Sequence, residues 1–366
     1  MDMVAVAKRE NNNKRKYLVV NRLQGKHIPV SGKTAFGIFD SLAEQLREYL
    51  HNNENLLVVG FAETATAIGA RLSVTLKCNY IQTTREQVDA AEYLFFTESH
   101  SHATEQKLIK NDIDSIIDST DRIVFAEDEV TTGNTIMKII DIIEKLYPGK
   151  VSFSVASLLN GMDEESLNRY KEKNINVHYL VKTNHDTYTD IAESFKGNGE
   201  YFPKNSSQTD FMITEIRDGY RNTRRLVNGE EYEKSCEKLF LKILGNTDLN
   251  SVKKILVLGT EEFMYPALYT ASRFEEYGVE ALTHSTTRSP IVTSLEKDYP
   301  LRKRFELSSF YDDERKTFIY NLQKYDEVIV ITDSSNRSDV GINTLVNALS
   351  SVGNNSIKIY RWCKND

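Results

Sequence analysis

Apolar runs of strand length alternate with segments of helical periodicity through most of the chain from Tyr17 onward. Residues 56–59 (LLVV) form a continuous apolar run that stops at Gly60, and residues 65–76 then show helical spacing. This alternation is typical of βαβ units, so it predicts an α/β fold with a largely parallel sheet. Further strands are predicted at residues 79–82, 122–126, 151–158 and 177–181, and a helix at residues 135–146.

The pattern loosens between about residues 184 and 251, where residues 198–209 are rich in turn-forming residues. A chain of 366 residues is also long for one compact core. A second α/β run follows, with a strand ending at Gly259, a helix at residues 266–277 and a strand at residues 327–332. We therefore expect a disordered N-terminus (1–16), a first domain (17–200), a linker or helical connection (201–250) and a second α/β domain (251–366).

The two runs repeat an order of motifs at similar intervals. Two readings of this recurrence stay open: an internal duplication with a degenerate second copy, or two ordinary α/β domains. The paired segments are residues 56–72 with 255–274, the Thr-Thr-Arg motifs at 83–85 and 286–288, and residues 124–134 with 329–339.

Composition narrows the class of protein. With 40% hydrophobic and 27% charged residues the chain is typical of soluble globular proteins. A net charge of -7 argues against a nucleic-acid partner, because phosphate backbones are held by clusters of Lys and Arg. The three cysteines lack the spacing of disulfide or zinc sites, and no apolar run spans a bilayer or forms a signal peptide. We expect a cytoplasmic protein with no membrane partner.

Candidate chemistry is concentrated in residues 124–135 (VFAEDEVTTGNT). Parallel strands end at the edge of the sheet where ligands bind, so Glu127 and Asp128 are expected in a crevice there. Adjacent carboxylates can accept hydrogen bonds from vicinal ribose hydroxyls or hold Mg²⁺, which prefers oxygen ligands. The following small residues can surround a phosphate at a helix N-terminus. These residues are Thr131, Thr132, Gly133, Asn134 and Thr135.

Residues 124–135 resemble the signature of type I phosphoribosyltransferases that binds 5-phosphoribosyl-1-pyrophosphate (PRPP). Other segments resemble one branch of that family, the orotate phosphoribosyltransferase-like proteins encoded with tellurite-resistance and stress-response genes. They are GKHIP (25–29), GFAETATAIG (60–69), FTESHSHATEQ (96–106) and TRSP (287–290), the last of which names the C-terminal TRSP domain of that branch. The resemblance covers nearly the whole chain. It implies a type I phosphoribosyltransferase fold with a hood, followed by a TRSP α/β domain.

The resemblance also implies roles for individual residues. The turn after the second core strand would hold pyrophosphate through backbone N–H groups, and Glu63 in it would contact a metal or complement a helix dipole. Arg85 would pair with the phosphate leaving group. Residues 86–106 would close over the reaction, with His100 and His102 contacting phosphate or transferring a proton. Lys26 and His27 would belong to a hood over the acceptor. The pyrophosphate turn comprises Gly60, Phe61, Ala62, Glu63 and Thr64.

The second half repeats part of this chemistry in a degenerate form. If it is a copy of the first, its strand ends at Gly259, Thr283 and Thr332 should converge on one crevice. A second anion site is then expected there. Its predicted residues are Thr260, Arg288, Ser289 and Asp333.

The reaction implied is displacement at C1 of PRPP by a small acceptor such as a nucleobase, with Mg²⁺ neutralising the pyrophosphate, or the reverse cleavage of a nucleotide. Such catalysis depends on positioning and electrostatics, which require the kinds of groups found here. A regulatory protein that binds PRPP without turnover is one alternative, and retention of Arg85 argues against it. A bifunctional enzyme with a separate TRSP-domain activity is another. The sequence leaves open the acceptor and the oligomeric state, for which a homodimer is one candidate.

Overall fold

The computed structural model describes residues 3–10, 15–51, 53–96 and 106–364. The chain divides into two compact units, and the division does not follow the order of the sequence. Unit 1 comprises Met1–Phe36, His185–Tyr220 and Ser235–Asp366, and unit 2 comprises Gly37–Asn184 and Arg221–Lys234. The boundaries fall within two 16-residue helices, α1 (Gly32–Arg47) and α7 (Gly229–Leu244).

Unit 2 is built on a six-stranded sheet in the order β10-β9-β8-β4-β5-β13. All neighbouring strands are parallel except the edge strand β13, which pairs antiparallel with β5. The central strand β4 is buried along its whole length, as its continuous apolar run predicts. The strands are β4 (Leu56–Gly60), β5 (Asn79–Gln82), β8 (Arg122–Val130), β9 (Ser152–Asn160), β10 (Asn176–Lys182) and β13 (Val227–Asn228).

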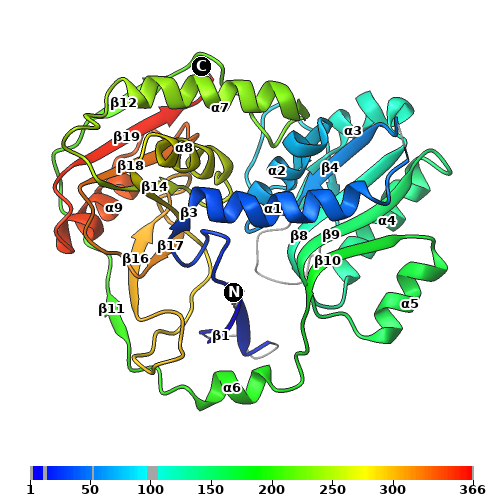
Figure 1. The fold of residues 1–366 in the computed structure, drawn as a ribbon, viewed down its shortest axis with the longest axis horizontal. Coiled ribbons are helices and arrows are strands. Elements are labelled where there is room, and N and C mark those ends of the chain that lie inside the picture. Colours follow the sequence, from blue (N-terminus) through cyan, green and yellow to red (C-terminus); the bar gives the residue numbers. More distant parts are fainter. Residues whose placement is uncertain (1–2, 11–14, 52, 97–105, 365–366) are drawn as a thin grey trace. The chain divides into compact units, whose positions relative to one another are not determined.

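Helices cover this sheet, as is typical of parallel sheets (Figure 1). In α4 the buried side chains Ile136, Ile139, Ile140 and Ile143 recur at helical spacing and form one apolar stripe. A small hairpin precedes α3. The elements are α2 (Thr66–Leu76), β6 (Tyr93–Phe95), β7 (Lys107–Ile109), α3 (Lys110–Ile116), a 3₁₀ turn (Ile117–Ser119), α4 (Asn134–Leu146) and α5 (Glu164–Glu172).

Unit 1 contains a second six-stranded sheet in the order β12-β19-β18-β14-β15-β3. Its strands are again parallel except for the edge strand β3, which pairs antiparallel with β15. The labelled strands β12, β19, β18 and β14 lie side by side in Figure 1. The strands are β3 (Val30–Ser31), β12 (Ile213–Ile216), β14 (Lys254–Gly259), β15 (Glu280–Ser285), β18 (Glu327–Thr332) and β19 (Ile357–Trp362).

Further elements of unit 1 pack around this sheet. A three-stranded sheet has the order β11-β16-β17, and its residues share a core with β14, β18 and α9. The two N-terminal strands, β1 and β2, pair antiparallel. The elements are β1 (Val4–Lys8), β2 (Tyr17–Asn21), α6 (Tyr188–Ser194), β11 (Glu200–Phe202), α8 (Tyr265–Glu276), β16 (Lys303–Ser308), β17 (Lys316–Tyr320) and α9 (Val340–Ser351).

The two large sheets share most of their topology. The order two-residue strand, 16-residue helix, strand, helix, strand, hairpin, strand, helix and strand occurs twice along the chain, although each two-residue strand pairs in the other sheet and α3 follows the hairpin in unit 2. The sixth strands differ in position, because β10 follows β9 whereas β12 precedes β13. The short strands even share a register: Val227 pairs with Tyr80 and Val30 with Thr283, and in both cases the partner stands three residues before a Thr-Thr-Arg motif. The recurrence of motifs in the sequence therefore corresponds to a recurrence of fold.

The helices after the short strands also begin in the same way. A Cβ on Gly32, the first residue of α1, would lie 2.4 Å from the backbone nitrogen of Ser272 in α8. A Cβ on Gly229, the first residue of α7, would lie 2.5 Å from the carbonyl oxygen of Ser73 in α2. Only glycine allows these close approaches of backbone to backbone.

The units differ from the domains expected from the sequence. Residues 1–16 were expected to be disordered, yet they contain β1, which pairs with β2 in unit 1. Residues 201–250 were expected to form a linker or helical connection, and they hold the whole of α7 together with the sheet strands β12 and β13. The reason is that β3 and β13 lie far from their sheets in sequence, so segments of both halves of the chain enter each unit.

The fold class predicted from the sequence is confirmed: parallel sheets flanked by helices in the first half, followed by a second α/β domain. Within the part of the chain that the structure describes, no helix has the length and apolar character needed to cross a membrane.

Candidate functional site

Two parallel strands of unit 2 bring the candidate groups together at their carboxyl ends. The strand β8 runs four residues beyond the apolar stretch predicted as a strand, so Glu127 and Asp128 lie inside it. Its neighbour β4 ends at Gly60, which pairs with Ala126. Both carboxylates are half-buried at the edge of the sheet.

The turn after β4 contacts the end of β8 directly. The Thr64 hydroxyl donates to Asp128 Oδ1 at 2.7 Å. The turn itself is fixed by the Ala62 N–H, which donates to the Thr83 hydroxyl at 2.8 Å. The peptide bond between Ala62 and Glu63 is cis. Of the five predicted residues in this turn, Gly60, Phe61 and Ala62 are buried, whereas Glu63 and Thr64 are half-buried.

Burial disfavours the charged forms of both carboxyls at the end of β8. The pKa of Glu127 lies well above its usual range because of burial and, second, the neighbouring Asp128 charge. Burial also raises the pKa of Asp128, although hydrogen bonds from Thr64 and from backbone N–H groups oppose this rise. Carboxyls with raised pKa values at the end of a strand mark a candidate functional site.

A small-residue turn connects β8 to α4. Gly133 has a φ of 70°, in the left-handed region, and a Cβ there would lie 2.6 Å from the Tyr170 hydroxyl oxygen. That hydroxyl donates to the Gly133 carbonyl oxygen, so it cannot move away without losing a bond. Around Gly133 the residues Thr132, Asn134 and Thr135 are exposed, and Thr131 is half-buried. The turn thus presents polar groups at the N-terminus of a 13-residue helix, where anions are favoured.

Arg85 follows the strand β5 in the same unit. Thr84 exchanges two backbone hydrogen bonds with Lys107 at the start of β7, and its hydroxyl accepts the Glu86 N–H at 2.9 Å. Arg85 therefore stands on a backbone that is fixed on both sides, and its side chain is half-buried. Its predicted contact with a leaving group stays a prediction, as do the roles of His100 and His102, which lie outside the described residues.

Lys26 and His27, predicted to form a hood over the acceptor, belong to unit 1. The Lys26 ammonium is fully buried and donates to the carbonyl oxygens of Glu261 at 2.6 Å and Thr286 at 2.9 Å. His27 is buried with its ring edge toward Tyr320. The structure thus gives Lys26 a structural role in unit 1, and a role toward the acceptor stays a prediction.

Of the residues predicted for a second site in unit 1, Thr260, Arg288 and Asp333 are linked through contacts of Glu261, Ser309 and Tyr311, whereas Ser289 is not part of these contacts. Tyr311 donates to Asp333 at 2.6 Å and lies 2.9 Å from the Thr260 hydroxyl. Arg288 donates to Glu261 at 2.5 Å. Ser289 accepts a bond from the Tyr320 hydroxyl through its carbonyl oxygen. Sequence reasoning did not include Tyr311, because it lies in the β16–β17 loop, which shows no motif.

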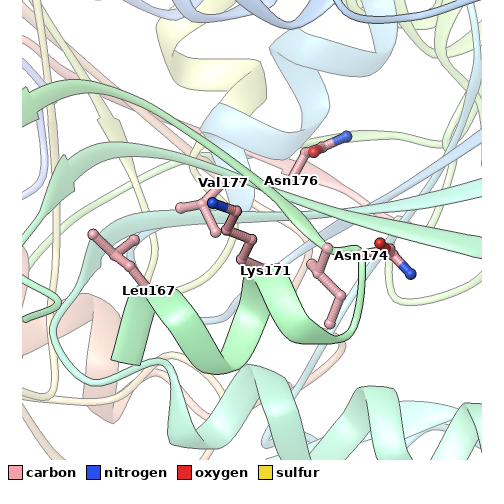
Figure 2. Close-up of a pocket in the computed structure, with 6 residues that line it drawn as sticks. Leu167, Lys171, Asn174, Asn176 and Val177 are labelled. Carbon is pink, nitrogen blue, oxygen red and sulfur yellow. The ribbon is translucent and has the colours of Figure 1, made fainter. Parts of the chain in front are cut away.

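A cavity of about 520 Å³ lies elsewhere in unit 2, between α5 and the start of β10 (Figure 2). It is at the amino end of β10, the opposite edge of the sheet from the carboxylates. No carboxylate or imidazole lines it, so it carries no candidate chemistry. Its lining residues are Leu167, Lys171, Asn174, Ile175, Asn176 and Val177.

The chemistry of the donors at the end of β8 fits Mg²⁺. This ion is usually held by one or two carboxylates together with water and phosphate oxygens, and Glu127 and Asp128 supply such a pair. Among the described residues no group of three or more His, Cys, Asp or Glu side chains is placed to hold a metal ion. A metal at this site would therefore share its coordination with oxygens of a ligand.

The structure thus places a carboxylate pair near the end of a parallel strand, beside a Thr/Gly turn that opens a helix, at the edge of the sheet where α/β proteins bind their ligands. Residues 3–186 match the family described as phosphoribosyl transferase (PRTase_2), and residues 226–349 match the TRSP domain C-terminal to it. The chain belongs to the phosphoribosyl transferase family. The predicted enzyme class and the predicted TRSP domain are thereby confirmed.

Several solved adenine phosphoribosyltransferases resemble about half of the chain, whereas no curated protein matches it. The enzyme of Rhodothermus marinus is 15% identical with a TM-score of 0.35, over 50% of this chain and 94% of that one. The Leishmania donovani enzyme is 15% identical with a TM-score of 0.36, over 49% and 76%. The Trypanosoma brucei enzyme, solved with AMP, pyrophosphate and ribose-5-phosphate, is 14% identical with a TM-score of 0.35, over 49% and 76%.

Proposed function

We propose that unit 2 binds PRPP together with Mg²⁺ and transfers ribose 5-phosphate to a small nitrogenous acceptor, releasing pyrophosphate. The observation that carries this proposal is the position of Glu127 and Asp128 near the end of β8, with only Glu129 and Val130 between them and the Thr/Gly turn of residues 131–135. The carboxylates suit the two ribose hydroxyls, and the turn suits the 5-phosphate. One continuous segment then recognises both ends of the ribose 5-phosphate.

The transfer breaks the bond between C1 and the pyrophosphate oxygen and forms a bond between C1 and the acceptor nitrogen. Positive charge develops on the ribose ring as the first bond breaks, and nearby carboxylates stabilise it. Asp128 is held for this role by Thr64, which also ties the turn after β4 to the end of β8. That turn presents backbone N–H groups, and Arg85 supplies a guanidinium for the departing phosphates.

Mg²⁺ would be held by Glu127 and Asp128 and would neutralise charge on the pyrophosphate. Because burial raises the pKa of Glu127, part of its population is protonated at a pH where an exposed glutamate is ionised. Metal binding should therefore release protons from this site, and the release should diminish as pH rises above the raised pKa.

Calorimetric titration of PRPP and Mg²⁺ into the protein tests the proposal. Replacing both acids (Glu127→Gln with Asp128→Asn) removes charge-assisted hydrogen bonds, so PRPP affinity should fall by at least about tenfold. A matched control removes two exposed charges from α4 instead (Asp141→Asn with Glu144→Gln) and should bind normally. Equal affinity in the double variant and the wild type would exclude this site.

Turnover is a separate question from binding. Incubating a cell extract with PRPP and either wild type or Asp128→Asn should show metabolites consumed together with PRPP only in the first case. Binding without any consumption would identify a regulatory protein instead of an enzyme. We also propose a cytoplasmic location, which is supported by three cysteines that are all free thiols (Cys78, Cys236 and Cys363).

A further inference from the structure

The turn after β14 in unit 1 repeats the hydrogen bonds of the turn after β4 in unit 2. In unit 2 the Ala62 N–H donates to the Thr83 hydroxyl at 2.8 Å, and in unit 1 the Glu261 N–H donates to the Thr286 hydroxyl at 3.0 Å. The N–H of each threonine donates in turn to the glycine that ends the first strand, at 2.9 Å and 3.2 Å. Glu261 therefore occupies in unit 1 the position of Ala62 in unit 2.

The residues that follow repeat as well. The second threonine of each Thr-Thr-Arg motif exchanges two backbone hydrogen bonds with a strand of the hairpin: Thr84 with Lys107, and Thr287 with Phe318. Arg288 thus occupies the position of Arg85. The pairing of β14 with β18 aligns in the same way as that of β4 with β8, which places Asp333 at the position of Asp128.

The two copies differ in the residue at the second position of the turn after the first strand, Ala62 in unit 2 and Glu261 in unit 1. At the position where unit 2 has the uncharged Ala62, unit 1 has a carboxylate whose side chain is 1% exposed. Glu261 Oε2 accepts from Arg288 Nε at 2.5 Å and from Arg315 Nη1 at 3.1 Å. Its other oxygen accepts from the Ser309 hydroxyl. Two guanidiniums and a hydroxyl around one set of oxygens form an arrangement by which proteins hold phosphate.

Ser309 and Arg315 come from the β16–β17 loop, the counterpart of the β6–β7 connection in unit 2. The same loop supplies Tyr311, which donates to Asp333 at 2.6 Å. Glu261, Arg288 and Asp333 are therefore each joined to a protein group from the turn, the motif after β15 or this loop. The site is closed around a carboxylate that belongs to the chain itself.

We propose that Glu261 fills, with its own carboxylate, the anion position of a second copy of the site, so that unit 1 accepts a phosphate-bearing anion only once this carboxylate is removed. The comparison of the two copies rests on the proposed function of unit 2. A partly buried pair of arginines without its carboxylate is costly, so an external oxyanion should stabilise a variant that lacks it.

The experiment uses the full chain with Arg85→Ala added to the replaced acids of unit 2 (Glu127→Gln with Asp128→Asn), so that the guanidinium proposed to contact pyrophosphate at the first site is also absent. In this background Glu261→Ala should melt at a lower temperature, and inorganic pyrophosphate should raise its melting temperature saturably. The background protein itself should not respond. Adding Arg288→Ala to Glu261→Ala should weaken the apparent pyrophosphate affinity by about tenfold or more, because a charge-assisted pair is lost.

Two results would overturn the proposal. One is a folded Glu261→Ala variant that pyrophosphate and inorganic phosphate do not stabilise. The other is a background protein with Glu261 intact that responds as strongly as the variant. If Glu261→Ala does not fold in chloride buffer, refolding in pyrophosphate replaces melting as the readout: recovery supports the proposal and no recovery overturns it. Failure of PRPP binding in the otherwise wild-type protein would instead refute the proposed function of unit 2.

Discussion

The Thr64 hydroxyl donates to the Asp128 carboxylate at 2.7 Å and joins the turn after one strand to the end of its neighbour. This bond opposes the rise in the pKa of Asp128 that burial causes. Replacing Thr64 with Val removes the bond at nearly constant volume, so PRPP affinity measured by calorimetry should fall roughly tenfold. Thr120→Val is the matched control, because its hydroxyl donates to Ile116 at the opposite edge of the sheet. If both variants bind alike, Thr64 does not position Asp128 for the ligand.

The stability of a Gly133 variant tests the conformation of the turn at residues 131–135. Gly133→Ala places a Cβ 2.6 Å from the Tyr170 hydroxyl and keeps a φ of 70°, so it combines steric overlap with backbone strain. Gly149→Ala has a φ of 67° with open space around it and isolates the backbone cost, about 1 kcal/mol. Urea unfolding should show a larger loss for Gly133→Ala, by roughly 1–3 kcal/mol. Equal losses would mean that Tyr170 moves aside freely.

Replacing Lys26 distinguishes a structural role of this residue from a role toward the acceptor. Lys26→Met leaves two buried carbonyl oxygens without a strong donor, so the free energy of unfolding should fall by about 1–3 kcal/mol. The control Lys33→Met alters an exposed lysine nearby in the chain and should be nearly neutral. A Lys26→Met protein of unchanged stability that binds an acceptor less tightly would favour the hood role instead.

His284 should make unit 1 sensitive to acid. Burial lowers its pKa to about 4, from an ordinary value of 6.5, and its Nε2 contacts the Tyr320 carbonyl oxygen. Between these two values the unfolded state binds more protons than the folded state, so stability falls as pH drops from about 6.5 toward 4. The loss approaches about 3 kcal/mol. In His284→Asn the dependence of the unfolding free energy on pH should be shallower in this window.

Much of the fold was predictable because it depends on local patterns. The continuous apolar runs at β4 and β18 and the isoleucine stripe of α4 each specify an element without reference to the rest of the chain. The helix α7 was predicted only as part of a linker or helical connection at residues 201–250, without bounds, although its buried side chains recur at helical spacing. These side chains are Tyr232, Cys236, Leu239, Phe240 and Ile243.

The two candidate sites also differ in how far they could be predicted from local sequence patterns. Glu127, Asp128 and the turn after them are contiguous, so their proximity follows from the sequence. The cluster around Glu261 joins residues that lie as far as 54 positions apart in the chain. Arg315, the most distant of them, comes from a loop with no motif. Such a cluster depends on tertiary packing. The two-residue strands β3 and β13 carry no periodicity at all and could not be predicted.

Those two short strands restrict how the chain can be divided. Each one belongs to one sheet by hydrogen bonding, while the helix that it starts continues into the other unit. An N-terminal fragment that ends between the two family matches, which cover residues 3–186 and 226–349, would keep β3 without its partner β15 and β5 without its partner β13. Each half would then expose an unpaired sheet edge, which is prone to aggregate.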